Sequence, residues 1–221
     1  MAPRKTFEAI LLLHCFGCFF ANGEWVDMSY PYDNTTIIWG TLTPFQHTLV
    51  HEGKLNDVPY FLVYDIKLTE HAGTNIDAPV HFAKGKWPVD EIPPKNLVGQ
   101  AVVVNISAKA SKNRSAELTV DDLQKWEEKY GRIPDGSILL VFTDWGKYWP
   151  NRKDYLGEDT NDTSLYTFPG KRIIQQLYNY RHYTLLSLIC ASPVRSTRRE
   201  GFWAYKLDSF IPRGLNVRDL S

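Results

Sequence analysis

Two nearly continuous apolar runs constrain the fold of this chain more than any other feature of its sequence. They occupy residues 100–107 and 137–143, and the first has Ala-Val-Val-Val-Asn-Ile at its centre. Such runs are typical of strands that are buried on both faces of a sheet. Between them, apolar side chains recur at helical spacing, with Thr119 and Asp122 close to a capping box and Gly131 as a stop signal. A strand, a helix and a second buried strand predict a mixed α/β layer structure.

The rest of the chain adds strands and loops and shows no sign of a second domain. Residues 60–70 are rich in Val, Ile, Tyr and Phe and predict a strand, and residues 24–30 predict a shorter one. Residues 34–57 predict a long irregular connection with strand fragments. A second helix is expected over residues 172–180. Because we find no internal repeat and no linker, residues 24–221 are expected to form one domain.

The first 23 residues have the pattern of a secretory signal peptide. A basic start precedes a mostly apolar stretch over residues 10–20, and Ala21-Asn-Gly23 offers small residues for cleavage. The apolar stretch is too short to serve as a permanent membrane anchor. We therefore expect residues 1–23 to be removed from a secreted protein that has no stable membrane anchor.

Net charge predicts no class of partner. The 25 basic residues balance the 25 acidic residues, so no global field attracts the molecule to nucleic acid. Partners therefore have to be inferred from a site, and we expect no nucleic-acid partner.

Four polar residues spaced along a short segment form the sharpest candidate site: His71, Asn75, Asp77 and His81. On a straight strand, residues 71 and 77 would lie roughly 20 Å apart, whereas a zinc–ligand bond measures about 2 Å. The segment must therefore curl to bind one ion, and Gly73 and the Asp77-Ala-Pro79 turn allow this. Two imidazoles and a carboxylate suit zinc, manganese or iron. Such residues also occur together in proteins without metal, so spacing alone leaves metal binding open.

The same segment closely resembles the signature of the cyclase family of kynurenine formamidase and isatin hydrolase-like enzymes, roughly His-x-Gly-Thr-His-x-Asp-x-Pro-x-His-Phe. The matching residues are His71, Gly73, Thr74, Asp77, Pro79, His81 and Phe82. Further similarity lies in residues 27–32, 87–104, 118–123, 143–149 and 168–170. The resemblance therefore covers residues 25 to about 170 of the chain.

This resemblance implies a fold, a chemistry and a set of site residues. The fold is a swivelling β/β/α domain, with a mixed sheet and flanking helices. The chemistry is divalent-metal hydrolysis of amide bonds, with aryl formamides and isatin as known substrate types. By position, His71, Asp77 and His81 would be the metal ligands, and Trp87 would either line the substrate pocket or act as a core or loop anchor. Family members commonly form dimers or higher oligomers, so a homodimer is also implied.

The chain departs from the family pattern at two places. Asn75 stands where the signature usually has histidine, so its amide is either a weak ligand or a group that orients one. Residues 171–221 are atypical, because they lack the Gly-x-Asp-x-x-Ser-x-Asp pattern that follows in the family.

Two functions follow from these observations. We favour a zinc- or manganese-dependent arylformamidase of tryptophan catabolism, which hydrolyses a small aromatic amide such as N-formylkynurenine. In it, His81 or a nearby carboxylate would pass a proton to the leaving nitrogen. The alternative is a catalytically impaired or truncated secreted family member that acts as a binding protein.

Overall fold

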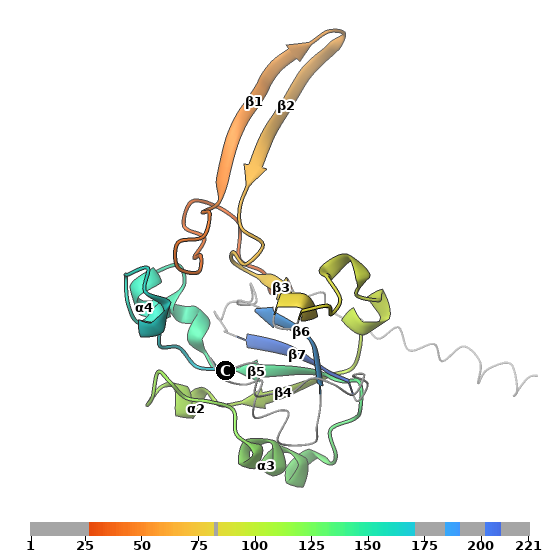
Figure 1. The fold of residues 1–221 in the computed structure, drawn as a ribbon, viewed down its shortest axis with the longest axis vertical. Helices are drawn as coiled ribbons and strands as arrows, with labels where there is room; N and C mark the ends of the chain where they lie inside the picture. The colour runs from red at the N-terminus through yellow and green to blue at the C-terminus, as the bar shows by residue number, and fades with distance from the viewer. Residues whose placement is uncertain (1–26, 82–83, 171–183, 191–201, 209–221) are drawn as a thin grey trace, which may run out of the picture.

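The described part of the chain forms a five-stranded mixed sheet and a separate two-stranded hairpin (Figure 1). The computed structural model describes residues 27–81, 84–170, 184–190 and 202–208. The strands are β1 (Gln46–Leu55), β2 (Val58–Lys67), β3 (Asn75–Asp77), β4 (Ala101–Asn105), β5 (Ile138–Phe142), β6 (Thr184–Cys190) and β7 (Phe202–Asp208). The helices are α2 (Ser107–Ala110), α3 (Val120–Tyr130) and α4 (Arg152–Leu156). Short 3₁₀ turns are η1 (Pro79–His81), η2 (Val89–Glu91), η3 (Pro94–Leu97), η4 (Trp145–Tyr148) and η5 (Thr163–Leu165).

The larger sheet has the strand order β3-β6-β7-β5-β4. Strands β4 and β5 are parallel, whereas the pairs β5–β7, β7–β6 and β6–β3 are antiparallel. Strand β3, which contains part of the candidate site, therefore forms one edge of the sheet and β4 forms the other. Strands β6 and β7 come from the atypical part of the sequence, and they connect the candidate site to the central strands.

Helix α3 begins and ends where the sequence predicts. The Thr119 hydroxyl accepts a hydrogen bond from the Asp122 backbone, and the Asp122 carboxylate accepts one in return from the Thr119 backbone. Gly131 follows the helix with a positive φ of 89°, a conformation that favours glycine. The expected strand, helix and strand over residues 100–143 are thus confirmed, and so is the mixed α/β class.

The hydrophobic core lies between this sheet and the elements that cover one of its faces. Alternate residues of β4 and β5 point into it, including the fully buried Leu139 and Val141, and Leu123 of α3 packs against them. The prediction that residues 100–107 are buried on both faces was wrong, because Val103 is 46% exposed. The reason is that Val102 and Val104 pack in the core with Leu123 of α3, whereas Val103 points to the opposite face of the strand.

Two local expectations need correction. Residues 34–57 are not one irregular connection, because β1 occupies residues 46–55 of it and pairs with β2. The expected strand over residues 24–30 is absent from its described part, residues 27–30. There the Tyr30 backbone N–H donates to the Thr74 side chain and so is not part of a strand ladder.

Several expectations concern residues outside the described ranges. These are the signal peptide over residues 1–23, the helix over residues 172–180 and Phe82 of the signature. Within the described ranges, no helix is both long and apolar enough to span a bilayer.

Candidate metal centre

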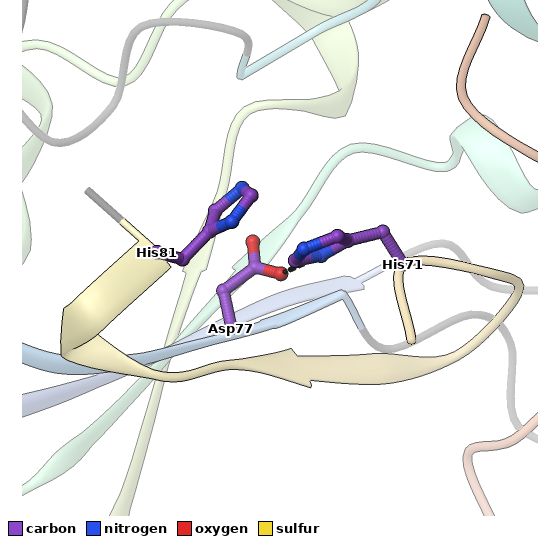
Figure 2. Close-up of side chains that lie close together, drawn as sticks. All are labelled: His71, Asp77 and His81. Atoms are coloured by element: carbon purple, nitrogen blue, oxygen red, sulfur yellow. Dashed lines mark hydrogen bonds and ion pairs between the residues drawn. The ribbon is translucent and has the colours of Figure 1, made fainter. Parts of the chain in front are cut away.

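Three side chains from one short segment converge beside the edge strand β3 (Figure 2). His71 lies in the loop before β3, Asp77 is the last residue of β3, and His81 is the last residue of η1. One potential ligand atom from each residue lies within 4.8 Å of the other two. The two imidazole ring centroids are 3.8 Å apart. The predicted curling of the segment is therefore confirmed.

The loop that carries His71 is tightly held against residues 36–38. Gly73 has a φ of +55°, and a Cβ added there would lie 3.2 Å from the Thr36 Cγ2 atom. Its backbone N–H donates to the Ile37 carbonyl at 3.2 Å. The preceding Ala72 is fully buried and forms a β-bridge with Ile38. Glycine adopts this left-handed conformation without strain and leaves room for the close neighbours. Gly73 therefore maintains the path of the loop that carries His71.

Two tyrosines also hold this loop in place. The Tyr30 backbone N–H donates to the Thr74 hydroxyl at 3.0 Å, and the Tyr32 hydroxyl donates to the Thr74 carbonyl. Tyr30 also donates its hydroxyl to the Gly146 carbonyl at 3.0 Å and stacks on Trp149 with a centroid distance of 3.9 Å. Burial raises the pKa of the Tyr32 hydroxyl, so this group remains a neutral donor at physiological pH.

The sequence did not reveal this supporting role of the two tyrosines. Residues 27–32 were noticed only as a stretch similar to the family, and Tyr30 lies 44 positions before its partner Thr74. The aromatic-rich Ser-Tyr-Pro-Tyr sequence was the available signal. It could not indicate which loop the tyrosines would contact.

A buried carboxylate lies at the centre of the cluster. Asp77 is only 9% exposed and accepts two hydrogen bonds on Oδ1. One comes from the His71 Nδ1 atom at 2.8 Å and the other from the Asn75 amide nitrogen at 3.0 Å. Because a carboxylate only accepts, His71 must carry its proton on Nδ1 in this arrangement. Both contacts leave Oδ2 as the oxygen available to a metal ion.

Asn75 points its amide nitrogen at Asp77 and donates a hydrogen bond to that carboxylate. Of the two roles that the sequence left open for this residue, the geometry supports the orientation of a ligand. Its direct ligation of a metal stays a prediction.

Trp87 is connected to the cluster through the backbone. Its carbonyl accepts a hydrogen bond from the Val80 N–H at 3.1 Å, beside the turn that carries His81. Its side chain is 41% exposed. The indole is therefore not a core anchor, and its contact with a substrate stays a prediction.

Glu70 is a neighbouring group that sequence reasoning did not single out. Its Oε1 lies 3.8 Å from the His71 Nε2 atom, and the side chain is 85% exposed. Its position directly before His71 was the only sequence signal. It adds an exposed carboxylate at the rim of the cluster.

The donor set fits a divalent metal ion. Two ligand atoms bound to one ion at about 2.1 Å lie roughly 3–4 Å apart, so the observed spread requires only small side-chain movements. Three protein ligands also match catalytic zinc sites, which keep one position open for water or substrate. His71, Asp77 and His81 would hold the ion, and the hydrogen bond from Asn75 would orient the carboxylate.

A mixed sheet with a His-Asp-His group at its edge strand defines an α/β domain with a candidate metal centre. The family model named Cyclase, with the description "Putative cyclase", matches residues 26–185. The chain belongs to the cyclase family, as its sequence signature predicted.

Two curated relatives and one solved structure show where the similarity lies. An isatin hydrolase from Roseibium aggregatum is 30% identical over 108 residues, which are 47% of this chain and 41% of the relative. A kynurenine formamidase from Bacillus cytotoxicus is 30% identical over 89 residues, or 38% of this chain and 40% of the relative. The structure of isatin hydrolase A from Labrenzia aggregata bound to benzyl benzoate matches with a TM-score of 0.62 and 28% identity. That match covers 79% of this chain and 70% of the other, and it confirms the cyclase-family fold.

The similarity does not extend over whole proteins. The matched stretches span about two fifths of the length of these curated relatives. The activity, the substrate and the partners of this chain are therefore matters for proposal.

Proposed function

We propose that this chain is a metal-dependent amidohydrolase of the arylformamidase type, which hydrolyses a small aromatic amide such as N-formylkynurenine. The observation that carries the proposal is the convergence of His71, Asp77 and His81, with ligand atoms within 4.8 Å of one another. The relatives named isatin hydrolase and kynurenine formamidase support the substrate class. We also propose that the protein is secreted, on the strength of its N-terminal sequence alone.

The cluster supports the chemistry of amide hydrolysis. A divalent zinc or manganese ion bound there would polarise the substrate carbonyl and make a water molecule acidic near neutral pH. In the overall reaction the carbonyl carbon gains a hydroxyl group from water, the C–N bond breaks, and the leaving nitrogen gains a proton. The hydrogen bonds from His71 and Asn75 fix the position of the Asp77 carboxylate beside the two imidazoles.

Among the described residues, Glu70 and His81 are the groups that we consider for the proton transfer. We assign it to the exposed Glu70 carboxylate, which lies 3.8 Å from the His71 Nε2 atom. His81 is the most exposed member of the cluster, but as a metal ligand it would have no ring lone pair left to accept a proton. Trp87, with its partly exposed indole beside the turn of His81, would stack on a flat aromatic substrate.

A second function is favoured by the one residue that departs from the signature. With an asparagine at position 75, the site has one imidazole fewer than the family pattern. A site weakened in this way fits a secreted binding protein that keeps the scaffold and has lost turnover.

The two functions are separated by metal content and turnover, measured on the same preparation. Elemental mass spectrometry should find near-stoichiometric zinc or manganese, and hydrolysis of N-formylkynurenine or isatin should stop on chelation and return with added metal. A protein with neither metal nor turnover on either substrate would support the binding protein instead.

The ligand assignment is tested by His81→Ala in comparison with the wild-type protein. Loss of one of three ligands is expected to abolish retained metal and activity together. Unchanged metal content in this variant would contradict the assignment of His81 as a ligand.

A further inference from the structure

Two Asn-x-Ser triplets on the surface are features that the metal centre does not explain. They belong to a set of four Asn-x-Ser/Thr triplets without proline, which begin at Asn34, Asn105, Asn113 and Asn161. Such a triplet is the acceptor for N-linked glycans in a secreted protein. All four acceptor asparagines are exposed, whereas Asn75 and Asn96, the two described asparagines that are not exposed, lie outside such triplets. The triplets therefore coincide with the surface of the described structure.

Asn105 and Asn113 lie on either side of the short helix α2, at the edge of the sheet that is farthest from the metal centre (Figure 1). Asn105 is the last residue of β4, and Asn113 follows the helix. The strand order β3-β6-β7-β5-β4 places β4 and β3 four strand spacings apart, or about 19 Å. A bulky group at this corner is therefore attached about as far from His71, Asp77 and His81 as the sheet allows.

Local hydrogen bonds hold the amide oxygen of both asparagines. The Asn105 Oδ1 atom accepts from the Ser107 backbone N–H at 2.9 Å and from the Ser107 hydroxyl at 2.7 Å. The Asn113 Oδ1 atom accepts from the Ser115 backbone N–H at 2.9 Å. Within the described ranges, the amide nitrogen of neither asparagine makes a hydrogen bond. A glycan bonded to that nitrogen keeps the oxygen as an acceptor, so both turns are compatible with the modification.

The middle residue of each triplet is anchored in the protein. In the first triplet, Ile106 is only 2% exposed and belongs to the hydrophobic core. In the second, the Arg114 guanidinium lies 4.8 Å from the centroid of the Trp145 ring. Its Nη2 atom also donates to the Asp154 carbonyl at 2.6 Å. Because these two middle residues pack against the body of the protein, the asparagine before each of them is held at the surface.

We propose that Asn105 and Asn113 each carry an N-linked glycan, which depends on the proposed secretion of the protein. The donor is an oligosaccharide that is linked through pyrophosphate to a lipid. A bond forms between the asparagine Nδ2 atom and the anomeric carbon of the sugar, and the bond from that carbon to the pyrophosphate oxygen breaks. The amide nitrogen loses one proton, and the lipid pyrophosphate leaves. Among the described strands β4 is an open edge, and hydrophilic glycans beside it disfavour pairing with another chain.

The test is site-resolved mass spectrometry of the full chain, purified from the culture medium of insect cells. Peptide N-glycosidase F converts a glycosylated asparagine to aspartate, and heavy-oxygen water labels the new carboxylate. Asn105 and Asn113 should both become labelled aspartates, whereas Asn151, an exposed asparagine outside any triplet, should not. An unlabelled Asn105 or Asn113 in the secreted protein would overturn the proposal for that site.

Paired variants of the third residue of each triplet are the matched controls. Ser115→Ala should abolish the glycan on Asn113 and Ser115→Thr should retain it, because the triplet requires a hydroxyl group. Ser107→Ala and Ser107→Thr should have the same two effects on Asn105. A glycan that persists in either alanine variant would contradict the assignment of its triplet.

A second form of the protein separates the glycans from the secretion. In this form, an established secretion signal replaces residues 1–23. If the native chain stays in the cytosol and only this form is labelled at both sites, the proposed secretion fails and the two acceptor sites are supported. If this form is secreted without label at either site, the glycan proposal itself fails.

Discussion

Replacement of Asn75 by alanine is the most direct probe of how the metal centre is supported. The Asn75 amide nitrogen donates to Asp77 Oδ1 at 3.0 Å, and that carboxylate is only 9% exposed. The alanine variant removes this donor and keeps His71, Asp77 and His81. If Asn75 orients Asp77, the variant should bind metal more weakly through the same number of protein ligands.

The size of the effect follows from the type of bond that is lost. A hydrogen bond to a charged group contributes about 1.5–3 kcal/mol, and loss of a partner that orients a ligand costs about 10–100-fold in metal affinity. At a free metal concentration of about 100 times the dissociation constant, the metal stabilises the folded protein by about 2.7 kcal/mol. A 30-fold weaker site retains only about 0.9 kcal/mol of this at the same concentration. For a chain of this size, the metal-induced rise in Tm should fall from about 8 °C to about 3 °C.

Isothermal titration calorimetry with zinc or manganese measures the dissociation constant, and thermal unfolding with and without metal checks it. The matched control is Asn161→Ala, at an exposed position in a different part of the chain. X-ray absorption at the metal edge counts the ligands directly. An unchanged dissociation constant in the Asn75 variant would refute the orienting role, and the loss of one ligand from the spectrum would show direct ligation instead.

Two further predictions concern stability. Leu139→Ala should lower the free energy of unfolding by about 2–5 kcal/mol in urea titrations, because Leu139 is fully buried in the core. Leu165→Ala, at a half-exposed position, should cost much less, and an equal cost would contradict the location of the core. Burial acts to raise the pKa of Asp122, but hydrogen bonds from Lys109 and Thr119 and the Lys109 charge hold that pKa below its ordinary value. The ionised Asp122 carboxylate therefore adds to the free energy of unfolding. This stabilisation is fully present above the unfolded-state pKa of an aspartate and is lost as the pH falls through the lower folded-state pKa. The stability difference between wild type and Asp122→Asn should therefore shrink on acidification below about pH 4, and a difference independent of pH would rule out this origin.

The sequence predicted the local elements of the central unit well. The capping box of Thr119 and Asp122 and the stop at Gly131 depend on residues at most a few positions apart, and the structure confirms them. Strands β4 and β5 were also recognised from their apolar composition. The burial of both faces of β4 was overestimated, because composition does not reveal which faces of a strand other elements cover.

The β1–β2 hairpin was recognised only in part. The residues of β2 are rich in strand-forming side chains, so they predicted a strand. The residues of β1 mix His, Glu, Gly and Lys with apolar side chains, so they resembled an irregular connection. The pairing of β1 with β2 supplies the hydrogen bonds that make it a strand, and that pairing is not visible in its own composition.

The gathering of the site residues could be anticipated because they lie within one short segment. His71, Asp77 and His81 are separated by few residues, and Gly73 and the turn at Pro79 allow a compact path. The hydrogen bond from Asn75 to Asp77 belongs to the same local geometry. The spacing of these residues therefore predicted which side chains meet, whereas their role as metal ligands was implied by the family resemblance.

Tertiary structure alone decided what holds that segment in place and what surrounds it. Tyr30 and Tyr32 reach Thr74 across more than forty positions of the chain, and β6 and β7 insert between the strand of the site and the central pair. The sequence by itself determined which polar side chains could meet, because they lie within one short segment, and their role as metal ligands stays a prediction. The order of the strands, the support of the loop and the exposure of the β1–β2 hairpin depend on contacts between distant residues, and no local pattern specifies which distant residues will meet.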